Sequence, residues 1–264
     1  MAQDFMTIAQ EAAQEAGGLL LDWRGRFQVK HKGHADLVTQ ADEAAQEAIL
    51  RRVRAAFPDH GFIGEEQQLM LAGGGDYVWI VDPLDGTTNY VHDLPIYAVS
   101  IALARGAELV VGVIYNPATG ECFTAERGAG AFLNGKRIAT SATETLSQAL
   151  VAASLPPKVE EDSPAFRQFV AAMKTTRAVR RLGSSALNLA YVAAGRLDAY
   201  WATTVHTWDV AAGMLLVREA GGAVSHVSGA PFYWREPHIA AAATEPLRVE
   251  LLTMLKASEQ PSKW

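Results

Sequence analysis

Apolar residues recur at helical spacing in two stretches near the start of the chain. The first stretch runs from about Asp4 to Leu21, and the second begins near Thr39 and ends before Pro58. In both stretches, apolar side chains return every three or four residues, which places them along one face of a helix. The sequence therefore predicts two amphipathic helices whose apolar faces pack against another layer.

A different pattern follows the glycine run at residues 73–75. The segment from Tyr77 to Val81 is short, apolar and rich in strand-forming residues, which is typical of a buried strand. From Ala98 to Thr140, apolar runs alternate with turn-forming residues, and Asn134-Gly135 is a strong hairpin signal. This stretch predicts an antiparallel meander.

The second half of the chain alternates short apolar runs with helical patterns. Strands that alternate with helices, after a meander, predict a layered α+β or α/β protein with two sheets. We expect one domain over residues 1–264, with an N-terminal half (1–145) and a C-terminal half (146–264). The C-terminal half should contain strands near residues 151, 178–182 and 200, and helices over 166–173, 185–194, 208–220 and from about 246 onward.

Composition narrows the possible functions. The chain has 264 residues, 49% apolar and 20% charged, as in ordinary globular proteins with a sizeable core. Its net charge of −6 argues against a nucleic-acid surface, which needs a basic patch. The single cysteine, Cys122, excludes an internal disulfide, and we see neither a signal peptide nor an apolar run long enough to cross a membrane. We therefore expect a cytoplasmic protein without a nucleic-acid or membrane partner.

Two carboxylates, Asp82 and Asp85, directly follow the expected buried strand, separated by Pro83 and Leu84. Pro83 fixes the backbone and holds a tight turn. Carboxylates held this close repel each other unless a cation lies between them. A hard divalent ion such as magnesium takes carboxylate and carbonyl oxygens as ligands. The pattern favours a magnesium site at the end of the strand, with the Leu84 carbonyl as an additional ligand.

The residues directly after this turn, Gly86, Thr87 and Thr88, indicate the start of a helix. Free amides at a helix N-terminus, together with the helix dipole, form a phosphate site. Metal ligands and phosphate ligands would then lie in one loop. The alternative interpretation is an aspartate turn followed by an ordinary capped helix.

Five separated motifs make the chain resemble the inositol monophosphatase family of magnesium-dependent, lithium-sensitive phosphatases. The motifs are ADLVTQAD (35–42), FIGEE (62–66), WIVDPLDGTTNYVH (79–92), GAFLNGK (130–136) and WDVAAGMLLVREAGG (208–222). The resemblance covers nearly the whole chain. It implies a layered αβαβα sandwich, with an antiparallel sheet in the N-terminal half and a mixed sheet in the C-terminal half. It also implies hydrolysis of a small phosphate monoester, two or three magnesium ions per active site, and a homodimer.

The resemblance also implies a set of metal ligands. The residues that match are the carboxylates of Glu65, Asp82, Asp85 and Asp209 and the carbonyl of Leu84. Glu66 is expected to be a solvated neighbour. Without the resemblance, Asp209 would be interpreted as an acidic residue that stabilises the N-terminus of its helix.

Further matches concern catalysis. The resemblance pairs Asp42 with Thr87 to orient and deprotonate the attacking water, with Glu65 in the same catalytic group. The alternative for Asp42 is an S/T-x-x-D capping pattern with Thr39, which explains both residues without catalysis. Lys32 matches a basic residue that approaches the active site, and a solvated surface lysine explains it nearly as well.

The resemblance implies two groups of substrate contacts. The phosphate is expected at Asp85, Gly86, Thr87 and Thr88, and the alcohol at Gly183, Ser184 and Ser185. Inositol-cleaving members carry a glutamate seven residues before the aspartate of the WD motif, where this chain has Ala202. This departure argues against myo-inositol 1-phosphate as the best substrate. Histidinol phosphate, a fructose bisphosphate and other polyol phosphates remain open.

A second functional hypothesis is a catalytically silent protein that binds a sugar phosphate or a cation. Such a relative would be expected to lose a metal ligand or the pair that activates water. This chain keeps all of the matching residues, which favours the enzyme.

Overall fold

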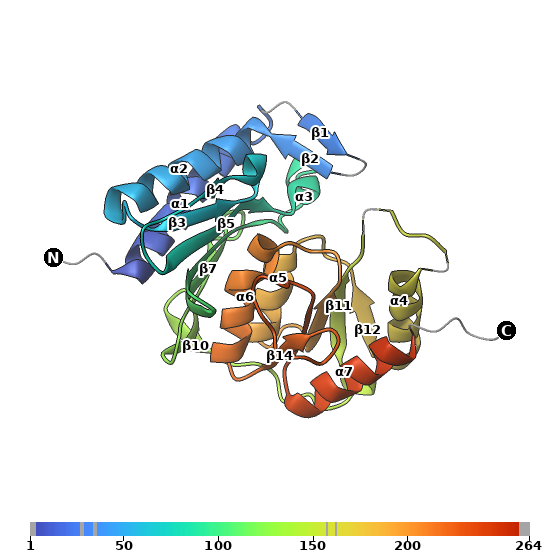
Figure 1. Ribbon diagram of the computed structural model, residues 1–264. Coiled ribbons are helices and arrows are strands. Elements are labelled where there is room, and N and C mark those ends of the chain that lie inside the picture. Colours follow the sequence, from blue (N-terminus) through green and yellow to red (C-terminus); the bar gives the residue numbers. More distant parts are fainter. Residues whose placement is uncertain (1–3, 27–28, 34–35, 157, 162, 259–264) are drawn as a thin grey trace.

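The computed structural model describes residues 4–26, 29–33, 36–156, 158–161 and 163–258, without the side chains between residues 27 and 39 or that of Gln67. The protein is built of five layers, as the αβαβα prediction requires (Figure 1). From one side to the other, these are α1 (Phe5–Trp23) with α2 (Gln40–Ala56), an eight-stranded sheet, α5 (Ser185–Ala193) with α6 (Thr207–Glu219), a five-stranded sheet, and α4 (Pro164–Thr175) with α7 (Glu245–Ala257).

The first layer is formed by the two predicted N-terminal helices. Asp4 caps α1, because its carboxylate accepts a hydrogen bond from the Thr7 amide at 3.3 Å. The buried face of α1 contains several alanines, among them Ala12 and Ala16, both fully buried. These small side chains let α1 lie close to α2 and to the sheet, with which they share one apolar cluster.

The eight-stranded sheet contains the predicted meander. Its strands lie in the order β10-β9-β8-β7-β6-β5-β3-β4, and all neighbours are antiparallel except β3 and β5, which are parallel. The sheet is therefore antiparallel with one parallel pair. The strands are β3 (Gly61–Gly64), β4 (Met70–Leu71), β5 (Tyr77–Asp85), β6 (Ala98–Arg105), β7 (Glu108–Asn116), β8 (Glu121–Glu126), β9 (Gly130–Leu133) and β10 (Lys136–Ile138).

Strand β5 is longer than the sequence predicted. It continues past Val81 to Asp85, and its pairing with β6 shifts register between Asp82 and Asp85. A bulge of this kind bends the strand and re-aims its side chains. The two carboxylates are therefore part of the strand end rather than of a loop after it.

A small antiparallel hairpin, β1 (Val29–Gly33) and β2 (Asp36–Thr39), precedes α2. The sequence did not predict it, because this polar segment lacks the apolar alternation that marks a strand packed on a core. Lys32 lies in β1, and its side chain is outside the described part of the chain.

The five-stranded sheet is mixed, as expected for the C-terminal half, with the order β12-β11-β13-β15-β14. Strand β11 is parallel to β12 and β13, whereas β15 is antiparallel to β13 and β14. The strands are β11 (Leu150–Ser154), β12 (Ala178–Arg180), β13 (Ala199–Ala202), β14 (Ala223–His226) and β15 (Ile239–Ala242).

Helix α6 lies between the two sheets and is apolar on nearly every side. Every residue from Val210 to Val217 is buried, as expected for a helix covered by a sheet on each face. At Gly112 in β7, a Cβ atom would lie 2.9 Å from the Ala212 carbonyl oxygen, so glycine is what allows the close approach of α6. Within the described residues, no helix combines the length and the apolar character needed to span a membrane.

Candidate active site

The bulged end of β5 buries two carboxylates. Asp82 is 2% exposed and Asp85 is 7% exposed. The Asp82 carboxylate accepts a hydrogen bond from the Leu84 amide at 2.9 Å, which closes the tight turn that Pro83 predicted. The turn thus fixes both carboxylates and the Leu84 carbonyl in one short segment.

Asp85 is held by the N-terminus of α5, which comes from the other half of the chain. The Ser184 hydroxyl donates to Asp85 Oδ2, and the amides of Ser185 and Ala186 donate to this carboxylate at 3.2 and 2.8 Å. Ser184, which was expected to contact the alcohol of the substrate, is 1% exposed. It is occupied instead as the N-cap of α5 and as the partner of Asp85.

Thr87 and Asp42 meet although they come from different helices. Thr87 begins the short helix α3 (Thr87–Val91), and Asp42 is in the first turn of α2 and 1% exposed. The Thr87 Oγ1 atom lies 3.4 Å from Asp42 Oδ1 and 3.1 Å from the Leu84 carbonyl oxygen. A hydroxyl has one proton, so it donates to one of these acceptors at a time. The Thr39 side chain, on which the capping alternative depends, is outside the described residues.

Glu65 and Glu66 follow β3, and Glu66 is the more buried of the two. Glu66 is 2% exposed, so the expectation of a solvated neighbour is wrong. The Gln46 side chain explains this position, because it accepts from the Glu66 amide at 2.9 Å and donates to the Glu66 carbonyl at 3.0 Å. This pair of bonds draws the start of the 3₁₀ turn Glu66–Gln68 beneath α2 and leaves Glu65 half-buried.

Asp209 lies in the first turn of α6 and is 18% exposed. Its carboxylate accepts a hydrogen bond from the His206 amide at 2.8 Å, which makes it part of a capping box. Ser100 of β6 donates to the Trp208 carbonyl at 3.2 Å and is also the strand partner of Asp82. The start of α6 is therefore tied to the sheet beside the bulge of β5.

The four carboxylates perturb one another. Burial raises the pKa of Asp82 well above its usual range, and the charges of Glu65, Asp85 and Asp209 raise it further. Burial and the Asp85 charge likewise raise the pKa of Asp209. Burial raises the pKa of Asp85 to about 6, although its three hydrogen bonds oppose the shift. Such mutual repulsion is what a bound cation relieves, so the donor set fits a hard metal ion.

The four carboxylates interact through their charges. Among the residues that the structure describes, no three acidic, histidine or cysteine side chains converge closely enough to form a ready-made metal-binding group. These carboxylates form one group electrostatically, because the charges of Glu65, Asp85 and Asp209 each raise the pKa of Asp82.

A cavity of about 510 Å³ is lined by Asp209 and by Gly86, the residue that follows Asp85. It lies between the two halves, because α3 and the segment before it form one wall and strand ends of the C-terminal half form the other. Its size is typical of a small-molecule site. Its lining consists of Gly86, Thr87, Thr88, Asn89, Ala153, Ser154, Leu155, Arg181, Leu182, Gly183, Ser185, Thr204, Val205 and Asp209.

The comparisons with known proteins agree over nearly the full length. A family model described as "Inositol monophosphatase family" matches residues 1–260. The chain belongs to the inositol monophosphatase family.

Several members of this family are similar to this chain over most of its length. An "Inositol-1-monophosphatase" of Mesorhizobium japonicum is 43% identical over 85% of this chain and 86% of its own. A "Nus factor SuhB" of Pseudomonas aeruginosa is 39% identical over 98% of each chain. The crystal structure of the extragenic suppressor protein suhB from Bartonella henselae superposes with a TM-score of 0.90, at 42% identity, and covers 95% of this chain and 98% of that one. Together they support a phosphomonoesterase.

Several residues that line the cavity were not predicted from the sequence. Ser154, Arg181, Thr204 and Val205 line it but belong to no recognised motif. Ser154 could have been found only from the sheet order, which places the end of β11 beside the end of β13. Gly86, Thr87, Thr88, Gly183 and Ser185, which were expected to contact substrate, do line the cavity.

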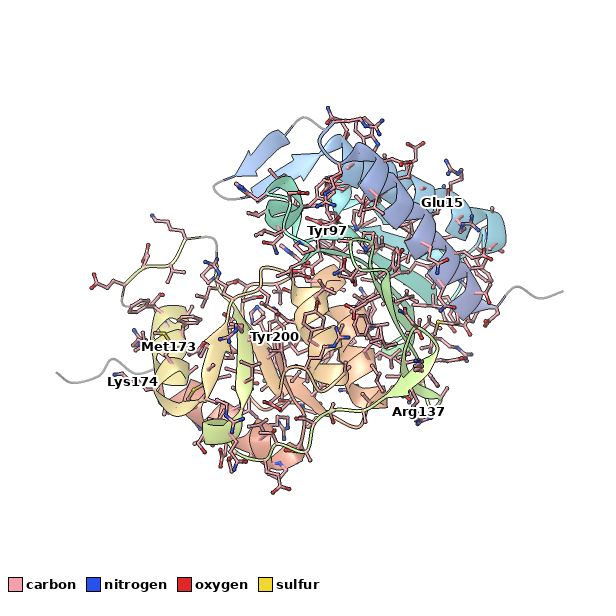
Figure 2. The ribbon with its side chains drawn as sticks, turned by 180° about the vertical axis from the view of Figure 1, so that it is seen from behind. Glu15, Tyr97, Arg137, Met173, Lys174 and Tyr200 are labelled. Atoms are coloured by element: carbon pink, nitrogen blue, oxygen red, sulfur yellow. The ribbon has the colours of Figure 1, made fainter. Side chains whose placement is uncertain are left out.

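Ala202 is fully buried and does not line the cavity. It is nevertheless the register partner of Ser154 in the parallel pair β11–β13, and it lies two residues from Tyr200 on the same face of the sheet. The Tyr200 hydroxyl is 2.7 Å from Ser154 Oγ, which is 3.2 Å from Ser185 Oγ. Tyr200 lies among the side chains packed between the sheets (Figure 2). Neutral hydroxyls of Ser154, Ser185 and Tyr200 therefore lie next to the strand end that carries Ala202.

Proposed function

We propose that this protein hydrolyses a small phosphate monoester and that the reaction depends on magnesium. The observation that carries the proposal is the set of mutually repelling carboxylates next to a cavity of substrate size. Glu65, Asp82, Asp85 and Asp209, with the Leu84 carbonyl, would hold two or three ions. When bound, magnesium would neutralise the phosphate, increase the acidity of water and stabilise the leaving alkoxide.

The protein's own groups would supply positioning. Thr87 and Asp42 are 3.4 Å apart, so the Thr87 hydroxyl can donate to Asp42 while its oxygen accepts a hydrogen bond from water. As this water attacks phosphorus in line, its proton would pass to the Thr87 oxygen while the Thr87 hydroxyl proton passes to Asp42. The backbone at Gly86, Thr87 and Thr88 would contact phosphate oxygens, and the C-terminal wall would contain the alcohol. Phosphoryl transfer needs positioning and charge stabilisation rather than a covalent nucleophile.

A phosphate-release assay on a panel of monoesters tests this proposal. With magnesium present, we expect release from inositol 1-phosphate, glycerol 2-phosphate, histidinol phosphate or a fructose phosphate. Calorimetric binding of these esters without any release of phosphate would instead favour the catalytically silent binding protein. The name Nus factor SuhB of one relative is compatible with either outcome.

We expect lithium ions and excess calcium to inhibit the magnesium-supported reaction. The proposed ligands are all oxygen atoms, which suit hard cations. Calcium takes six to eight ligands in flexible geometry at longer distances than magnesium, so it would bind the carboxylates while placing phosphate and water poorly. Initial rates at fixed magnesium, with increasing lithium or calcium, check this expectation. Full activity supported by zinc alone would contradict the oxygen-ligand assignment.

A second prediction concerns the position of Ala202. Ala202 does not line the cavity, but its register partner Ser154 does, so the longer side chain of Ala202→Glu should reach the alcohol. This variant should raise kcat/KM for inositol 1-phosphate roughly ten- to a hundredfold, because a hydrogen bond to a charged group contributes about 1.5–3 kcal/mol. Glycerol 2-phosphate offers fewer hydroxyls and should be hydrolysed at nearly the unmodified rate. Ala202→Gln is the control of equal size without the charge. Unmoved selectivity in the glutamate variant, with its melting temperature retained, would show that this position does not contact the alcohol.

A further inference from the structure

The alcohol side of the cavity carries a cation that the proposed chemistry does not use. Among the described residues that line the cavity, Asp209 and Arg181 are the charged ones. Asp209 belongs to the carboxylate group, whereas Arg181 is on the segment between β12 and α5. The described wall of the cavity therefore includes one acidic and one basic side chain.

Arg181 forms no ion pair with any residue that the structure describes. The neighbouring Arg180 is exposed as well, but it ends β12, donates to the Val179 carbonyl at 3.1 Å and is not part of the cavity wall. Exposure of an arginine is ordinary, since most arginines are solvated. What distinguishes Arg181 from Arg180 is its place in the wall of a substrate-sized cavity.

The residues that directly follow Arg181 connect it to α3 and to the carboxylates. The Leu182 carbonyl accepts a hydrogen bond from Asn89 Nδ2 at 2.8 Å, and Asn89 also donates to the Ile96 carbonyl at 2.7 Å. Two residues further on, the Ser184 hydroxyl donates to Asp85. The segment that carries Arg181 is thus bonded both to α3 and to a proposed metal ligand.

Gly183 makes this connection possible. Its φ is +81°, a left-handed conformation that favours glycine, and a Cβ atom there would lie 2.9 Å from Asn89 Nδ2. The chain can therefore reverse between Arg181 and Ser184 while staying in contact with Asn89. Arg181 and Asp209 thus both line the cavity of about 510 Å³.

The charges indicate which substrate would use this arrangement. The transferred phosphate would be neutralised by metal ions at the carboxylates, which leaves Arg181 free to attract another anion. A guanidinium presents a planar fork of donors that matches phosphate oxygens in a bidentate arrangement. We propose that Arg181 is a specificity-determining residue that binds a second phosphate group on the alcohol, so that bisphosphate esters are preferred over monophosphates. This inference rests on the proposed phosphatase function.

The test compares fructose 1,6-bisphosphate with fructose 1-phosphate, which differ only in the second phosphate. In Arg181→Gln, we expect kcat/KM for the bisphosphate to fall about ten- to a hundredfold, mainly through KM, because one charge-assisted contact is lost. For fructose 1-phosphate, kcat/KM should stay nearly unchanged. Arg181→Lys keeps the charge but loses the fork, so its loss should be intermediate. Arg180→Gln is the matched control and should change neither substrate.

The outcomes separate this inference from the function on which it rests. An equal loss for both substrates in Arg181→Gln, or the same selective loss in Arg180→Gln, would overturn the assignment of Arg181. Calorimetric affinity for fructose 1,6-bisphosphate, measured with calcium in place of magnesium so that the ester is not hydrolysed, gives a readout without turnover and should fall by the same factor in Arg181→Gln. If no ester releases phosphate but this affinity still depends on Arg181, the proposed function fails and the anion site stands. If fructose 1-phosphate is hydrolysed and neither measurement responds to Arg181, only the anion site fails.

Discussion

Replacement of Asp209 by asparagine should lower turnover about 10²–10³-fold while the fold survives, and Glu65→Gln should do the same. Each change removes one negative charge from the group that would bind the metal ions, and single electrostatic contacts of this kind are worth about 10²–10³ in rate. Asparagine keeps an oxygen that can accept the His206 amide, so the cap of α6 is retained. Initial rates at saturating magnesium measure the effect.

The stability of Asp209→Asn without metal gives an independent check. The pKa of Asp209 is raised in the folded state, so the folded protein binds more protons than the unfolded chain between the ordinary and the raised pKa. Stability is therefore lost as the pH rises through this window. Asp209→Asn removes that loss, and its metal-free melting temperature at neutral pH should equal or exceed that of the unmodified protein.

Two further observations would decide the role of Asp209. Magnesium should raise the melting temperature of the unmodified protein, because a ligand of the folded state stabilises it, and should do so less in the variant. Glu219→Gln at the other end of α6 is a control, since Glu219 accepts the Gly128 and Gly130 amides away from the cavity. Unfolding of both Asp209→Asn and Glu65→Gln in the absence of metal would instead indicate structural roles.

Asp42→Asn should slow turnover about 10²–10⁴-fold while magnesium binding is retained. The variant removes a base from the proposed water site, and general base catalysis contributes about this much. Asp42 is buried within 3.4 Å of the Thr87 hydroxyl, and asparagine of the same shape keeps an acceptor there. The kcat value and the magnesium concentration for half-maximal rate separate the two effects.

The partner of Asp42 allows a matched comparison. Thr87→Val removes the hydroxyl at nearly constant volume, whereas Thr87→Ser keeps it. We expect the valine variant to resemble Asp42→Asn and the serine variant to remain active. Unchanged turnover in Asp42→Asn would reduce Asp42 to a helix residue, as the capping pattern with Thr39 allows.

Local sequence signals were sufficient for much of this site. The spacing of Asp82, Pro83 and Asp85 predicted the turn, and the motif match supplied Asp209 more than a hundred residues away. Apolar periodicity predicted the α and β layers, because a helix or sheet face must be covered. The sequence did not predict the C-terminal end of β5, because a bulge leaves no signature in the spacing of apolar residues.

The features that the sequence did not predict depend on contacts between distant segments. The Ser184–Asp85 bond joins residues 99 positions apart, and nothing local to Ser184 distinguishes a substrate contact from a carboxylate partner. Glu66 is buried because Gln46, on α2, binds its backbone. Arg181 reaches the cavity wall through the bonds made by Asn89 and Ser184. Each case requires knowledge of the chain's path between the two halves.

The magnesium dependence of the reaction is tested most directly by phosphate release from glycerol 2-phosphate, measured with chelator-treated protein before and after magnesium is returned. The proposed mechanism needs a cation among Glu65, Asp82, Asp85 and Asp209, whose pKa values are raised or whose charges raise those of their neighbours. We predict no release above the uncatalysed rate in EDTA and full recovery when magnesium is in excess. Full turnover in EDTA would contradict the proposed metal dependence of the reaction.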